Sequence, residues 1–204
     1  MSKKQPIVIS EKIATQSQVF TVQSQELTFS NGTTVVYERI LSGSDGAVLI
    51  VPLLEDGTLL LIREYGAGVG RYELGFPKGK VDAGESWAQA AVRESQEEIG
   101  FLPVKTKLLD SVSLAAGYMT HYTHIVLATD LTPKTAQGDE PEPLEVVPWH
   151  LDDWRALLNE PHFSEGRAYA ALMLVLKETG RIWIVYVFYN SPPPLFPYDL
   201  KCGV

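Results

Sequence analysis

The sequence predicts a single α/β domain, and three observations support this fold class. Short runs of apolar residues, alternating or continuous, recur between turn signals along much of the chain, as expected for strands. A capped helix follows a glycine-rich loop near the middle, and residues 165–180 show the pattern of a second, amphipathic helix. At 204 residues the chain is also long enough to bury a substantial core.

The part of the chain before the central helix predicts strands. Apolar positions alternate along residues 7–29, and the alternation resumes after the turn signal Ser30-Asn31-Gly32, which indicates a hairpin or meander. Residues 46–54 and 58–65 flank Glu55-Asp56-Gly57, so we expect them to form a second hairpin. Their nearly continuous apolar content indicates strands that are covered on both faces.

The chain after the central helix predicts a strand pair, a short strand and two helices. In order, these elements are residues 107–115, 122–130, 146–149, 151–159 and 165–180. His121 and His124 lack metal-ligand spacing, so we expect structural or surface roles for them. The aromatic run beyond residue 181 is compatible with an added strand, a dimer contact or a poorly ordered end.

The central stretch, residues 75–101, combines a glycine-rich loop with a helix. Ser86 and Gln89 have the spacing of a capping box, so we expect the helix to run from about Trp87 to Ile99 and to end at Gly100. A helical wheel separates two faces of this helix. Its predicted packing face consists of Ala88, Val92, Ser95 and Ile99, and its other face presents Glu94, Glu97 and Glu98.

The three glutamates of this helix indicate a site for a divalent cation. Like charges this close repel one another, and Arg93 can neutralise only one of them. Several converging oxygen ligands are what a hard cation such as Mg²⁺ prefers. The glycines of the loop allow the backbone to approach such an ion, and Lys78 and Lys80 add positive charge where phosphates would arrive. The alternative is a solvated acidic helix face.

Composition excludes several classes of protein. The formal net charge of −8 argues against a protein that holds nucleic acid by its backbone. A single cysteine, Cys202, excludes an internal disulfide framework or a cysteine-based zinc site, and it suits the reducing cytoplasm. The first residues have no apolar core typical of a secretory signal, and no run is long enough to span a bilayer, so we expect no membrane partner.

Several charged residues elsewhere in the chain fit either a surface or a site role. Arg39 ends the first set of strands, Arg63 follows an apolar run, and Glu73 precedes the central loop, where it fits a substrate contact, a metal contact or a partner of Lys78. Residues 136–145 form an acidic loop that two prolines hold extended. This loop is either a solvated run or a mobile segment that brings a carboxylate to the metal as general base.

The spacing of the central stretch resembles the Nudix box. Gly79 is followed after five residues by Glu85, then after seven by Arg93-Glu94, and the run ends with Glu97-Glu98, Ile99, Gly100 and Phe101. Ser95 departs from the pattern, because an aliphatic residue usually stands there. The segments YERI, LIREY, YELGFPKG and GDEPEPLEVVPW resemble the ADP-ribose pyrophosphatase branch, and above all its bacterial hydrolases of ADP compounds. The likeness covers about residues 7–180, although GFPKG replaces a common proline-alanine-glycine turn.

This resemblance implies a fold, an assembly and a reaction. The fold is an α/β/α sandwich with a mixed sheet, preceded by an N-terminal antiparallel strand region. The domain limits that we expect are 1–45 for N-terminal strands that serve dimerisation, 46–181 for the Nudix domain and 182–204 for a tail of unknown role. The implied assembly is a homodimer with exchanged N-terminal strands. The implied reaction is hydrolysis of the diphosphate of ADP-ribose, NADH or diadenosine polyphosphates, which releases AMP.

The resemblance also assigns roles to residues at matching positions. The implied ligands of Mg²⁺ or Mn²⁺ are Glu85, Glu94, Glu97, Glu98 and the backbone of Gly79. The implied catalytic residues are Arg93, which orients the glutamates, Glu97, and either Glu140 or Glu142 as general base. The implied substrate contacts are Arg39, which reaches across the dimer, Arg63, Glu73 and Lys78. Two alternatives are a hydrolase of nucleoside triphosphates or sugar nucleotides, and a module that senses ADP-ribose without cleaving it.

Overall fold

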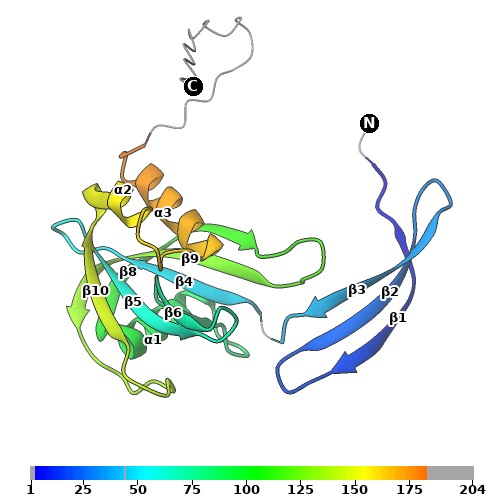
Figure 1. The fold of residues 1–204 in the computed structure, drawn as a ribbon, viewed down its shortest axis with the longest axis horizontal. Helices are drawn as coiled ribbons and strands as arrows, with labels where there is room; N and C mark the ends of the chain where they lie inside the picture. The colour runs from blue at the N-terminus through cyan, green and yellow to red at the C-terminus, as the bar shows by residue number, and fades with distance from the viewer. Residues whose placement is uncertain (1–2, 44, 183–204) are drawn as a thin grey trace, which may run out of the picture.

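The computed structural model describes residues 3–43 and 45–182, and it contains three β-sheets and two main helices. In the first sheet, β1 (Ile7–Gln16), β2 (Thr21–Thr28) and β3 (Thr34–Leu41) form an antiparallel meander. This confirms the strands expected around Ser30-Asn31-Gly32, with Gly32 in the left-handed region at φ 83°. The sheet lies beside the rest of the molecule (Figure 1), and all ten residues of β1 are exposed.

A mixed four-stranded sheet forms the centre of the main domain. Its order is β7 (Lys78–Lys80), β4 (Ala47–Pro52), β9 (Tyr122–Pro133) and β8 (Phe101–Ser113), and only β4 and β9 run parallel. A second, antiparallel sheet has the order β10 (Glu145–His150), β5 (Thr58–Gly66) and β6 (Arg71–Gly75). The strand pair expected from residues 107–115 and 122–130 is confirmed, and its two strands run antiparallel.

The expected hairpin of residues 46–54 and 58–65 is wrong in its pairing. β4 pairs with β7 and β9, whereas β5 pairs with β6 and β10, and only a single bridge, Leu53–Leu59, links the two segments. The turn at Gly57 does form, with φ 87°. The apolar side chains of β4 and β5 are buried in two different sheets. The local sequence pattern would be the same if the two strands formed one hairpin, so it cannot distinguish these arrangements.

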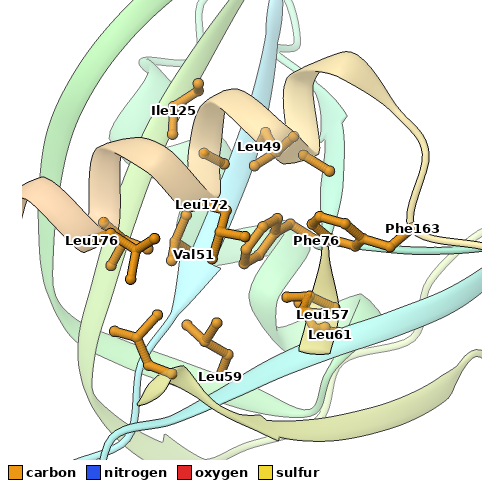
Figure 2. Packing of buried hydrophobic residues seen from close by; sticks show 14 of the residues in the cluster. Leu49, Val51, Leu59, Leu61, Phe76, Ile125, Leu157, Phe163, Leu172 and Leu176 are labelled. Atoms are coloured by element: carbon orange, nitrogen blue, oxygen red, sulfur yellow. The ribbon is translucent and has the colours of Figure 1, made fainter. Parts of the chain in front are cut away.

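Helices cover both faces of the mixed sheet, as in an α/β/α sandwich. Leu49 and Val51 of β4 pack towards α3 (Gly166–Glu178), whereas Val48 and Ile50 pack towards α1 (Trp87–Glu98). Figure 2 shows Leu172 and Leu176 of α3 beside Val51, and Phe76 beside Phe163. The predicted helix 151–159 is shorter, consisting of a 3₁₀ turn (Leu151–Asp153) and α2 (Trp154–Leu157).

The predicted packing face of α1 is only half right. Ser95 and Ile99 are buried as expected, but Ala88 and Val92 are only partly buried and line a shallow hollow near Thr106. The residues of α1 that face the core are Ala90, Ala91, Ser95 and Glu98. The helix is therefore rotated so that its small side chains meet β4, which brings Glu98 into the interior rather than to the open acidic face.

The tail predicted at 182–204 lies, except for Ile182, outside the described residues, and the domain limits stay predictions. Within the described ranges, no helix has the length and apolar content needed to cross a membrane.

Candidate active site

The capping box fixes where α1 begins and therefore where its glutamates point. The Ser86 side chain accepts the Gln89 backbone N–H, and the Gln89 side chain accepts the Ser86 backbone N–H at 2.9 Å. The unusual Ser95 is fully buried, and its hydroxyl donates to the Ala91 carbonyl at 2.7 Å. A polar group is thus tolerated at this position because the preceding turn of the helix satisfies it.

Arg93 lies at the centre of the predicted carboxylate cluster. Its guanidinium donates to Glu94 at 2.7 Å, to Glu97 at 3.0 Å and to Glu85 at 3.0 Å. It also donates to the Lys80 carbonyl at 2.9 Å, which ties the helix to β7. These bonds, led by those with Glu85, raise the pKa of Arg93 even though partial burial opposes the charge. Arg93 in turn lowers the pKa of Glu85.

Glu98 is the most buried acid of the cluster, with 7% of its surface exposed. Its carboxylate accepts the Lys78 backbone N–H at 2.8 Å. Burial raises the pKa of Glu98 to about 8, although Lys78 acts in the opposite direction. An acid held in this environment is costly to ionise, unless a cation beside it compensates the charge.

Gly79 provides a space that the Glu94 carboxylate fills. A Cβ at this position would lie 1.8 Å from Glu94 Oε1, so no other residue fits without displacing that side chain. Burial raises the pKa of Glu94 against the effect of Arg93, and the nearby charges of Glu97 and Asp139 add to the rise. The backbone of β7 and the glutamates of α1 are therefore in direct apposition, as the glycine in the loop predicts.

The acidic loop places its carboxylates in different surroundings. Glu140 lies near Glu64 and Lys78, and burial together with Glu64 and Asp139 raises its pKa. Glu142 instead accepts a hydrogen bond from Tyr72 Oη at 2.5 Å, on β6. Of the two residues predicted as general base, Glu140 therefore lies near Lys78, whose backbone holds Glu98, whereas Glu142 is engaged by Tyr72.

The predicted substrate contacts are dispersed. Lys78 forms an ion pair with Glu64 beside the cluster. Arg63 pairs with Glu145 at 3.1 Å, and Glu73 is hydrogen-bonded to Arg71 and Ser164. Arg39 lies on the N-terminal sheet, where it pairs with Glu11 at 3.3 Å. Within the described part of a single chain, Glu73 and Lys78 therefore line one common hollow, whereas Arg39 and Arg63 do not line it.

Two hollows flank the β7 strand. One, of about 440 Å³, is lined by the cluster and the acidic loop, namely Lys80, Asp82, Arg93, Glu94, Glu97, Gln137, Gly138 and Asp139. The other, of about 400 Å³, lies between β5, β6 and the start of α3. Lys78 links the second hollow to the glutamates of α1, since its backbone N–H donates to Glu98 and the residue lines that hollow.

The carboxylates of the cluster are suitable ligands for a divalent cation, although those of Glu85, Glu94 and Glu97 are hydrogen-bonded to Arg93 in this structure. Among residues 3–43 and 45–182, no three acidic, histidine or cysteine side chains are arranged around one common ion position. However, Glu85, Glu94 and Glu97 share one guanidinium, and Glu98 is buried beside a lysine that already pairs with Glu64. Carboxylate oxygens with an uncompensated negative charge are the ligands that Mg²⁺ or Mn²⁺ prefers.

Four residues that line the two hollows were not assigned a role from the sequence: Glu64 and Asp139, which were noted only as members of charged segments, and Glu165 and Arg167, which were missed. Glu64 has a local signal, because it follows directly on the buried residues of β5. Glu165 and Arg167 have none, since only the tertiary fold carries the start of α3 to β6.

Comparisons with known proteins cover nearly the whole chain. The family model for the NUDIX domain matches residues 43–173, and that for the NudE-type Nudix hydrolase N-terminal domain matches residues 6–39. The chain is 45% identical over 184 residues to ADP compounds hydrolase NudE of Escherichia coli (strain K12), covering 89% of this chain and 98% of that protein. It is 25% identical over 178 residues to ADP-ribose pyrophosphatase of Bacillus subtilis (strain 168), covering 83% and 95%.

The fold has a solved counterpart. A crystal structure of ADP compounds hydrolase matches with a TM-score of 0.82 at 44% identity, covering 89% of this chain and all of that one. The resemblance and the fold class predicted from the sequence are therefore both confirmed.

Proposed function

This chain belongs to the Nudix hydrolase family, in its NudE-type branch, and on that premise we propose that it hydrolyses the diphosphate bond of ADP-linked compounds and releases AMP. The substrates that we propose are ADP-ribose, NADH and diadenosine polyphosphates. The observation that carries the proposal is the cradle at Gly79, where β7 receives Glu94 beside the buried Glu98. Nudix hydrolases in general depend on a divalent metal, and we propose Mg²⁺ or Mn²⁺ here.

The residues that would hold the metal are Glu94, Glu97 and Glu98, with Glu85 and the Gly79 backbone as additional ligands. Arg93 hydrogen-bonds three of the four glutamates at 2.7 to 3.0 Å, which keeps their carboxylates together. When bound, a divalent cation supplies Lewis-acid stabilisation of the negative phosphate oxygens.

In the proposed reaction, the oxygen of water attacks one phosphorus in line with the bridging oxygen. The bond between that phosphorus and the bridging oxygen breaks, and the bridging oxygen leaves with the other phosphate group. We propose Glu140 as the base that takes the proton from water. Its raised pKa and its position near Lys78 support this role, whereas Glu142 is engaged by Tyr72.

Mass spectrometry of the products formed in ¹⁸O-water tests this reaction. It identifies which substrate is cleaved and which phosphorus receives the oxygen. Glu140→Gln should lower kcat by at least about 100-fold, and the matched Glu142→Gln should lower it by less than about threefold. The reverse order of effects would assign the base to Glu142, and unlabelled products would contradict hydrolysis.

We also propose a homodimer joined through the N-terminal sheet, working in the cytoplasm without a nucleic-acid or membrane partner. Ile9 is 57% exposed, Ile13 52% and Val36 60%, on strands whose apolar side chains have little cover within the chain. Ile13 shares a face of the sheet with Arg39, whereas Val36 lies on the opposite face. A second copy that packs around this sheet would bury apolar side chains on both faces, and we propose that it brings Arg39 towards the partner's site. Sedimentation should show that the Val36→Glu variant is a monomer, and an activity assay should show that its turnover is reduced. A Val36→Glu variant that remains a dimer would refute this interface.

A further inference from the structure

The acidic loop between β9 and β10 is attached to the main domain near both of its ends. Close to its start, Ala136 donates its backbone N–H to the Gln96 carbonyl of α1 at 3.0 Å. At its other end, Leu144 packs against the cluster of buried residues that includes Ile99. The segment between these attachments, residues 137–143, carries the carboxylates that face the candidate active site.

A side-chain contact from β6 holds the middle of this segment. Tyr72 Oη donates to Glu142 Oε1 at 2.5 Å. Tyr72 lies opposite Tyr65 in the pair of β5 and β6, and the two rings meet edge to face with their centroids 5.5 Å apart. The hydrogen bond to Glu142 raises the pKa of Tyr72, so the phenol keeps its proton and remains a donor. The hydroxyl is therefore presented from two paired strands and not from a second loop.

Two prolines stiffen the backbone on either side of Glu142. Pro141 and Pro143 each have a fixed φ angle, and a residue that precedes a proline has a restricted backbone of its own. Glu140 and Glu142 both precede a proline. The segment therefore has few backbone conformations, and a contact that fixes Glu142 also limits where Glu140 can lie.

Glu140 depends on this backbone for its position. The charges of Glu64 and Asp139 add to the effect of burial in raising its pKa, and Lys78 acts in the opposite direction, so Glu140 lies close to these groups. In the part of the chain that the structure describes, no hydrogen bond holds the Glu140 side chain itself. Its place beside Lys78 is therefore set by the loop.

We propose that Tyr72 is a positioning residue: its hydroxyl holds Glu142, and the stiff segment from Glu140 to Pro143 then keeps Glu140 where it can take the proton from water. The inference rests on the proposed function, in which Glu140 is the base. It gives Glu142 an indirect role, as the acceptor through which β6 controls the loop.

Steady-state kinetics with Mg²⁺ and ADP-ribose test this role. Tyr72→Phe should lower kcat by about tenfold and change KM by less than about twofold, because the loop base acts on water and not on substrate binding. The control Tyr65→Phe removes a hydroxyl from the neighbouring ring and retains its packing, so it should keep both constants within about twofold of wild type. A Tyr72→Phe protein with the constants of Tyr65→Phe would overturn the proposal.

Substitutions of Glu142 separate the loss of an acceptor from the loss of a charge. Glu142→Gln keeps an oxygen that can accept from Tyr72 and should lower kcat by less than about threefold, whereas Glu142→Ala should lower it by about tenfold. The double variant Tyr72→Phe/Glu142→Ala should be no slower than either single variant, because both changes remove the same hydrogen bond. Losses that multiply in the double variant would refute the coupling.

A second cycle tests which residue the contact serves. If Tyr72 acts through Glu140, Tyr72→Phe should change kcat by less than about twofold in a Glu140→Gln background. A further tenfold loss in that background would show that Tyr72 acts on another group, and it would overturn the assignment.

Motion of the loop in the metal-free protein provides a readout that does not depend on catalysis. The ¹⁵N order parameters of the Glu140 and Glu142 amides should be about 0.85 in wild type and Tyr65→Phe, and should fall below about 0.6 in Tyr72→Phe. Thermal unfolding should show that all variants are folded. Equal order parameters in the three proteins would contradict a positioning contact.

The two proposals fail in different ways. If the wild-type protein cleaves no ADP-linked compound, the proposed function fails, and the order parameters decide whether Tyr72 fixes the loop. If the wild-type protein cleaves ADP-ribose and Tyr72→Phe behaves like Tyr65→Phe, only the positioning role fails.

Discussion

The substitution Glu98→Gln removes a buried ionisable group but retains the size of the side chain and an acceptor for the Lys78 N–H. In the folded protein the pKa of Glu98 is raised to about 8 from an ordinary 4.5, mainly by burial. Between these two values the folded state holds the proton and the unfolded state has released it. Stability from this group is therefore complete below the lower value and is lost as the pH rises towards 8.

The size of the effect follows from the same shift. Each pH unit inside this window changes the free energy of unfolding by about 1.4 kcal/mol. At pH 7 the unfolded state has released this proton and the folded state has retained it, which should lower the stability of the metal-free protein by up to about 3 kcal/mol relative to its value below pH 4.5. We expect Glu98→Gln to raise the free energy of unfolding at pH 7 by about 1–3 kcal/mol, while it lowers turnover with Mg²⁺ by orders of magnitude.

Urea unfolding in EDTA, at several pH values from 5 to 8.5, measures how the free energy of unfolding of each protein depends on pH. The wild-type protein should lose stability across the series, and Glu98→Gln should lose much less. Glu55→Gln, an exposed carboxylate in a turn, is the control for removing a charge. A Glu98→Gln protein that is less stable than wild type at pH 7, with the same slope against pH, would refute the reasoning.

Two further substitutions test how the cluster is assembled. Gly79→Ala should reduce Mg²⁺-dependent turnover by at least about tenfold, because its Cβ would lie 1.8 Å from Glu94 Oε1. The control Gly117→Ala, which has open space around the added Cβ, should retain activity. Equal activities of the two variants would contradict the role of Gly79 in receiving Glu94. Ser95→Ala should change the free energy of unfolding by less than about 1 kcal/mol in urea titrations, since the hydroxyl and its acceptor, the Ala91 carbonyl, are both intrahelical. A loss of more than about 3 kcal/mol would show that Ser95 has another role.

The central helix could be predicted closely because its signals are local. The capping pair Ser86 and Gln89, the terminal Gly100 and the spacing of the glutamates all act within a few residues. The rotation of the helix was predicted less well. A wheel assigns a face by side-chain polarity, but close packing against β4 selects the smallest side chains, Ala90 and Ala91, and takes Glu98 inside with them.

Long-range pairing accounts for the other differences. The turn at Gly57 is typical of a hairpin, yet β4 and β5 belong to separate sheets, because β4 pairs with β9 and β5 pairs with β10. The same holds for the second hollow, which Glu165 and Arg167 line together with Lys78 because α3 packs on the mixed sheet. No spacing rule connects residues that are about ninety positions apart.

Calorimetric titration of Mg²⁺ and Mn²⁺ into the folded protein, with methylene-bridged ADP-ribose present, tests the central claim most directly. The glutamate cluster should take up the ion in a saturable manner, and Glu98→Gln should weaken this uptake by at least about tenfold. Absence of any uptake by the wild-type protein would contradict the claim that this acidic face exists to hold a doubly charged ion.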